Sequence, residues 1–195
     1  MTYLIKHKQL SNNYFIINRK VQLFVLFISL LLPISPFAQT DEYTIKIVLL
    51  ERFTRFIEWP EESAISDTSQ PFVLGLIGKN PFGSKPEDIY STRKMRNKKV
   101  KIRYISKLDE IEGCHLLFIS KSEEKKLSKI LSFTKDKPIL TISDTKGFAE
   151  EGVLINLYLK EDKVQFEINE SAVRESGLSM SYMLLKTGKI VNPAR

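Results

Sequence analysis

Two adjacent residues, Cys114 and His115, are of types that can do chemistry together. A thiol beside an imidazole base is the arrangement that activates a cysteine nucleophile. Neighbours on a strand point to opposite faces of the sheet, however, so these two side chains cannot pair there. We therefore interpret Cys114 as a small buried apolar residue and His115 as a strand or edge residue.

A glycine-containing segment, residues 78–85, resembles a phosphate-binding loop. It reads Gly-Lys-Asn-Pro-Phe-Gly-Ser-Lys and follows an apolar run. The P-loop pattern needs lysine before serine or threonine, whereas serine comes first here. Pro81 also removes a backbone donor, and Pro86 is expected to interrupt the following helix. The alternative is that Asn80 and Pro81 cap and start a short helix at the end of a sheet strand.

The sequence contains few other residues of the types that form metal or catalytic sites. His115 is the one histidine after residue 38, whereas a catalytic zinc site usually needs two or three histidines or cysteines. The chain has no Gly-x-Ser-x-Gly nucleophile motif. We predict no catalytic residue, no metal ligand, no cofactor and no enzymatic activity.

The N-terminal segment has the features of an export signal. Basic residues up to Lys20 precede an apolar run from Val21 to Pro33, and the small residue Ala38 follows. This order predicts a signal peptide at 1–38 and a single mature domain at 39–195. The alternative is an uncleaved anchor, but the apolar core is short for a span of about 20 residues.

Removing that segment changes the charge argument. The whole chain has a net charge of +7, and residues 39–195 keep 26 basic and 23 acidic residues, or +3. The basic run Arg93–Lys99 contains no aromatic residue that could stack on a base. We interpret it as a solvated face and predict no nucleic-acid partner. No later segment is long and apolar enough for insertion of the mature domain into a membrane.

Hydrophobic patterns predict the elements of the mature chain. Spacings of three and four predict a helix over 41–59, in which Ile45 belongs to the apolar stripe and Phe53 and Phe56 to the core. Asp41 is expected to cap this helix and Pro60 to end it. Strands are predicted at 72–77, 100–104, 116–119, 139–142, 153–160 and 163–168, and later helices after the caps Ser120, Asn169 and Ser179.

This element order indicates the fold class. Apolar strands that alternate with helices predict a three-layer α/β domain with a mixed, mainly parallel sheet flanked by helices. The last two predicted strands are joined by two residues, which predicts a C-terminal β-hairpin near an edge. Short closing helices follow it.

Several segments together resemble a known family. Phe53, Phe56, Trp59 and Pro60 form an F-x-x-F-x-x-W-P pattern that resembles the helix-ending signature of the YfiR-like family of bacterial periplasmic proteins. Later segments continue the resemblance in order. They include Phe72–Gly83, the strand that starts at Cys114, and the closing residues Asn169, Gly177 and Leu184. The motif residues are expected to be structural.

The resemblance implies a function as well as a fold. It implies a non-enzymatic periplasmic regulator of a Gram-negative bacterium that represses an inner-membrane signalling protein, a diguanylate cyclase in the best-understood members. An outer-membrane lipoprotein that sequesters the regulator is a second implied partner. A homodimer is a further possibility that the sequence does not decide. The chain departs from the family at Glu150-Glu151-Gly152, where a double glycine is common, and it lacks the extra cysteines of some members.

Two classes of function follow. A regulator needs an exposed apolar patch for its partner. A periplasmic small-ligand sensor needs a concave pocket, which in open α/β sheets lies at the strand ends. The candidate partner or ligand surface comprises Trp59, Asn80, Phe82, Gly147 and Phe148.

Overall fold

The computed structural model describes residues 37–63, 65–67 and 69–191. The chain divides into two units, 1–38 and 39–195, and the architecture below is that of the second unit. The predicted signal peptide falls almost entirely outside the described residues and stays a prediction, as does the domain boundary. Among the helices that the structure describes, none is long and apolar enough to cross a membrane.

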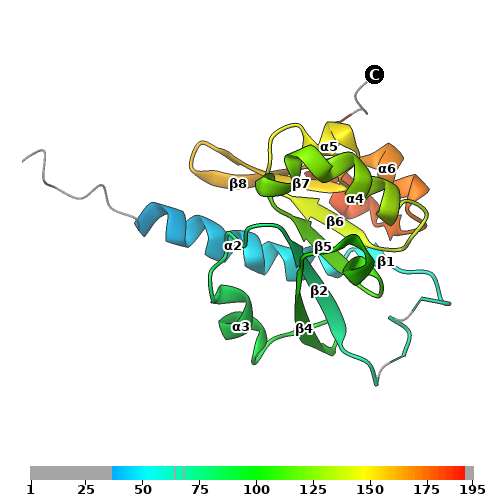
Figure 1. Cartoon of the computed structure of the whole chain (residues 1–195). Helices are drawn as coiled ribbons and strands as arrows, with labels where there is room; N and C mark the ends of the chain where they lie inside the picture. The colour runs from blue at the N-terminus through cyan, green and yellow to red at the C-terminus, as the bar shows by residue number, and fades with distance from the viewer. Residues whose placement is uncertain (1–36, 64, 68, 192–195) are drawn as a thin grey trace, which may run out of the picture. The chain divides into compact units, whose positions relative to one another are not determined.

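An eight-stranded mixed sheet forms the centre of the domain (Figure 1). Its five central strands are parallel, β8 runs antiparallel to β7, and β3 runs antiparallel to β4. The prediction of a mainly parallel α/β sheet with a C-terminal hairpin is therefore confirmed. The strand order is β10 (Lys189–Val191), β8 (Lys163–Asn169), β7 (Ile155–Lys160), β6 (Leu140–Ser143), β5 (Leu116–Ile119), β2 (Phe72–Ile77), β4 (Lys98–Ile105) and β3 (Lys94–Met95).

Helices cover both faces of the sheet, as the three-layer prediction requires. Leu74 and Leu76 of β2 belong to one apolar cluster, whereas Val73 and Ile77 belong to another on the opposite face. The first cluster is covered by α2 (Phe37–Thr54), α3 (Lys85–Tyr90), α6 (Glu170–Glu175) and α7 (Tyr182–Thr187). The second is covered by η1 (Leu108–Ile111), α4 (Leu127–Thr134), which follows η2 (Lys121–Lys126), and α5 (Phe148–Glu151).

The first helix ends earlier than the sequence predicts. It stops at Thr54 and not at Trp59, because the chain then pairs with a distant segment. The strand β1 (Ile57–Glu58) runs antiparallel to β9 (Ser179–Met180). Ile45, predicted to lie on the buried stripe, is 49% exposed, whereas Ile47 and Leu50 are fully buried. The placement of Ile45 was therefore wrong, and the buried face is rotated from the predicted one.

Helix caps were predicted with mixed success. Asn169 caps α6 as expected, and its side chain accepts a hydrogen bond from the Ala172 backbone N–H. Ser179 does not cap the last helix, because it pairs in β9; Ser181 takes that role. Pro86 does not interrupt a helix. It lies in the first turn of α3, where a missing N–H costs no hydrogen bond.

Candidate functional site

The five predicted surface residues lie at two opposite ends of the parallel strands. Trp59 packs edge-on against Phe72, the first residue of β2, with ring centroids 6.1 Å apart. The other four follow the carboxyl ends of β2 and β6: Asn80, Phe82, Gly147 and Phe148. The structure therefore brings four of the five to one end and places Trp59 at the other.

The loop after β2 is held closed by its own side chains. The Asn80 amide oxygen accepts a hydrogen bond from the Phe82 N–H at 2.8 Å, and its nitrogen donates to the Gly83 carbonyl at 2.8 Å. Phe82 packs against the ring of Phe118 at 4.7 Å and that of Tyr43 at 5.7 Å. Phe82 and Phe148 are both buried, so their side chains contribute to the core. Asn80 and the backbone remain as the groups through which this end could contact a ligand.

A buried ionic network joins α2 to the same end of the sheet. The Lys46 ammonium lies 2.7 Å from Asp144, which follows β6, and 2.6 Å from Glu42. Burial lowers the pKa of Lys46, but the hydrogen bonds to Asp144 and Glu42 outweigh this, so the pKa is raised. In an open α/β sheet this end is where ligands usually bind. Here the chain's own helix and lysine occupy part of it.

The cysteine and histidine do not form a catalytic pair. His115 stacks on Phe72 and its Nδ1 accepts a hydrogen bond from the Val73 N–H at 2.9 Å. Cys114 belongs to the apolar cluster on the other face, and burial raises the pKa of its thiol to about 11. No group of three residues able to hold a metal ion occurs in the described part of the chain. The arrangement therefore supplies neither an activated nucleophile nor a metal site there.

The family-motif residues make structural contacts. Phe53 packs against Phe166 at 5.0 Å between ring centroids, and Leu184 is buried in the same cluster. Asn169 donates from its side chain to the Ala149 carbonyl at 2.7 Å. Gly177 has a φ of +72°, a left-handed conformation that favours glycine. Phe56 is partly buried, while Pro60 follows Trp59 at the end of the motif.

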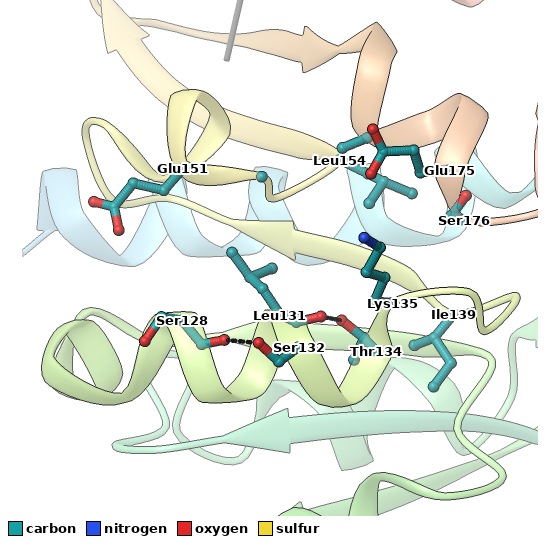
Figure 2. A pocket seen from close by; sticks show the side chains of 12 residues that line it. Ser128, Leu131, Ser132, Thr134, Lys135, Ile139, Glu151, Leu154, Glu175 and Ser176 are labelled. Atoms are coloured by element: carbon teal, nitrogen blue, oxygen red, sulfur yellow. Dashed lines mark hydrogen bonds between the residues drawn. The ribbon is translucent and has the colours of Figure 1, made fainter. Parts of the chain in front are cut away.

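A cavity of about 320 Å³ lies between α4 and α6, a place that the sequence did not indicate (Figure 2). Figure 2 shows Leu131 and Lys135 projecting from the α4 segment toward the opposite wall. The hydroxyls of Ser132 and Thr134 already donate to backbone carbonyls of their own helix. No ion pair within the described ranges engages the charged groups Lys135, Glu151 and Glu175. These three are the groups that a ligand could contact.

A second feature missed by the sequence is an exposed apolar surface at one edge of the sheet. Tyr182 is 73% exposed and Met183 66% exposed, both on α7, and Ile190 of β10 is also exposed. These three residues, here called the α7–β10 surface, are half of the six large exposed apolar residues of the described chain. Among described strands, β10 has no neighbour on its outer side. The helical periodicity of the sequence did not predict this surface, because the start of α7 depends on the distant β1–β9 pairing.

Comparison with known proteins identifies the family. The sequence matches the YfiR/HmsC-like family over residues 43–189. The chain belongs to this family. No curated protein matches the sequence.

Similar solved structures are distant. One is the ligand-free, open form of a substrate-binding protein with adhesive properties from Clostridium difficile (10% identity, TM-score 0.49, 65% of this chain and 56% of that one). Another is an ABC domain in complex with L-Trp from Streptococcus pneumonia (10% identity, TM-score 0.49, 72% of this chain and 61% of that one). The chain spans less than two thirds of either structure.

Within this YfiR/HmsC-like chain, two features that could bind lie at places that the sequence did not indicate. The α7–β10 surface exposes large apolar side chains, and the cavity between α4 and α6 is lined by both apolar and charged groups. The first suits a protein partner and the second suits a small molecule.

Proposed function

We propose that this chain is a periplasmic, non-enzymatic regulator that binds and represses an inner-membrane diguanylate cyclase, and so lowers cyclic-di-GMP synthesis. The observation that carries the proposal is the exposure of Tyr182 and Met183 side by side on α7. Large apolar side chains gathered on a surface mark protein interaction sites. Tyrosine and methionine are also enriched in such interfaces relative to the rest of the surface.

The position of these residues strengthens the argument. Leu184, the next residue, is buried in the core, so α7 is anchored through one face and presents the other. The adjacent strand β10 offers unpaired backbone groups on its outer side within the described sheet. An edge strand beside an apolar helix can accept an additional strand from a partner. Membership of the YfiR/HmsC-like family supports the signalling role. An outer-membrane lipoprotein that competes for the same surface would relieve the repression.

The experiment is capture of a partner from detergent-solubilised inner membranes by the tagged exported protein. We expect recovery of a membrane protein with cyclase activity, and higher cellular cyclic-di-GMP when the gene is deleted. The double variant Tyr182→Asp/Met183→Asp should lose at least about tenfold in capture, because each side chain would bury apolar area in the complex.

The matched control is Ile45→Asp/Leu159→Asp. It introduces the same charge at two apolar residues that are 49% and 50% exposed elsewhere on the domain. The control should capture the partner as well as the unmodified protein does. Equal capture by both variants would contradict the role of the α7–β10 surface. Recovery of no membrane protein would contradict the regulator proposal.

A small-ligand sensor is the second candidate function, and the cavity of Figure 2 favours it. One cationic and two anionic side chains, Lys135, Glu151 and Glu175, line the cavity without ion pairs inside the described ranges. Their charges suit a small molecule that carries both signs. Native mass spectrometry of the periplasmic protein tests this. Retention of a small molecule that Lys135→Ala/Glu175→Ala abolishes would favour the sensor.

A further inference from the structure

The outer strands β3 and β4 carry a positive charge that the protein does not neutralise. Between Asp88 and Asp109 the sequence has eight lysines and arginines and no acid. Ion pairs within the described residues involve none of the six that are exposed, Lys107 and five others on or beside the β3–β4 pair. These five are Arg93, Lys94, Arg96, Lys99 and Lys101, here called the basic hairpin.

The register of the hairpin brings like charges together. Lys94 lies directly opposite Lys99 across the β3–β4 pair, and like charges in this position destabilise a sheet. Arg96 and Asn97 form the connection, with φ values of +50° and +62°. Asparagine tolerates this left-handed conformation, whereas arginine is uncommon in it. Lys94 and Lys99 therefore stand where other residues would be more stable, which indicates a role for their charge outside folding.

Exposed cations of the basic hairpin are part of the lining of two open cavities that share Lys94 and Asn97. The first, of about 550 Å³, also has Arg55 and Arg96 in its lining. The second, of about 490 Å³, has Lys99 in its lining. Arg55 is already paired with Glu51 at 2.8 Å. The free ammonium and guanidinium groups are exposed and long, so they suit many anions spread over a surface better than one enclosed anion.

We propose that the basic hairpin binds the anionic phospholipid surface of a membrane without inserting into it. Each lysine or arginine near such a surface increases partitioning by about a factor of five. In the periplasm this contact would hold the domain on the membrane that contains its partner, a consequence that rests on the function proposed above. The contact itself does not depend on that function.

One observation favours a lipid surface over a nucleic acid, and a second makes lipid binding compatible with the partner contact proposed above. The segment from Arg93 to Arg103 has no aromatic residue, so it offers no platform for stacking nucleic-acid bases. The strand order places β3 and β10 at opposite ends of the sheet. The α7–β10 surface therefore stays accessible while the basic hairpin faces lipid, and both contacts are compatible with one orientation of the domain.

Sedimentation with lipid vesicles tests the proposal on the exported protein purified from the periplasm. Vesicles of phosphatidylcholine with about 30 mol% phosphatidylglycerol are compared with phosphatidylcholine alone. The test variant is Lys94→Gln/Arg96→Gln/Lys99→Gln. The control, Lys121→Gln/Lys125→Gln/Lys129→Gln, removes the same charge from exposed lysines that form no ion pair with a described residue.

We expect the unmodified protein to bind only the anionic vesicles, and less as salt rises from about 0.05 M to about 0.5 M. The hairpin variant should bind on the order of 100-fold more weakly, and the control should stay within about threefold. Equal losses in the two variants, or equal binding to both vesicle types, would overturn the proposal. Retention on immobilised polyglutamate without vesicle binding would assign the hairpin to an acidic protein instead. Partner capture is measured in detergent, without a bilayer. A failure of vesicle binding would therefore not change the outcome of the capture experiment.

Discussion

The two ends of the eight-stranded sheet differ in the side chains that they expose. At the β3–β4 end most exposed residues are lysines and arginines, although Tyr104 of β4 is also exposed, and charge protects the sheet edge. At the β10 end the exposed residues include the large apolar side chains of Tyr182, Met183 and Ile190, and the edge strand is three residues long. Neither arrangement stabilises an isolated monomer. Like charges repel one another at the β3–β4 end, and apolar area is exposed to water at the β10 end. If the two contacts proposed above are right, each end of the sheet serves a different partner.

The ionic network of Lys46, Asp144 and Glu42, which joins α2 to the loop after β6, tests whether the two ends depend on one core. Lys46→Met should cost about 3–5 kcal/mol of unfolding free energy, because it leaves the largely buried Asp144 without a counter-charge. Partner capture and vesicle binding should then fall together at temperatures near the new midpoint. Chemical denaturation measures the change.

Two variants sharpen this result. The double variant Lys46→Met/Asp144→Leu removes both charges of the more deeply buried pair, leaves only the more exposed Glu42, and should recover most of the loss. Arg174→Met breaks an exposed pair with Glu170 and should change stability by less than about 0.5 kcal/mol. A loss for Arg174→Met equal to that for Lys46→Met would show that burial does not decide the strength of these pairs.

A change at the basic end should separate stability from binding. Lys94→Glu replaces the like-charge pair with Lys99 by an opposite-charge pair, and should raise the unfolding free energy by about 0.2–1 kcal/mol. The same variant should bind anionic vesicles less and capture the membrane partner normally. Thermal melts, sedimentation and capture measure the three effects. A destabilised Lys94→Glu protein would mean that the lysine pair is not repulsive.

The last prediction concerns the Cys114 thiol, which is expected to have the smallest effect on stability and binding. Burial raises the pKa of Cys114 to about 11, so alkylation at pH 8 should be slow and should rise about tenfold per pH unit toward pH 11. The thiolate fraction grows with pH, which fixes the direction of this change. Because Arg103 reaches within 3.8 Å of the Cys114 sulfur, the rate also reports whether the β4 edge is in place.

Mass spectrometry of the alkylated protein gives this rate. The Tyr182→Asp/Met183→Asp variant should react as slowly as the unmodified protein, since its changes lie at the other end of the sheet. Fast alkylation of that variant would show that the two ends are coupled.

Local patterns in the sequence determined the core of the fold. The strands 72–77 and 116–119 were predicted to the residue, because a strand buried on both faces must be apolar at every position. The mainly parallel sheet, the hairpin and the Asn169 cap followed from equally local signals. The two-residue period of a strand predicted that Cys114 and His115 point in opposite directions. Both residues precede β5, but their side chains do lie in different surroundings.

The tertiary structure alone decided where these elements end and what they expose. Ile57 pairs with Met180, a partner too distant in sequence for any local pattern to reveal, and this pairing shortens α2 and delays α7. The separation of Trp59 from Asn80 likewise follows from the opposite ends of the same strand. The exposed α7–β10 surface and the register of Lys94 against Lys99 also depend on pairings between strands. Hydrophobic periodicity records whether a residue is buried, but only packing determines what lies beside it.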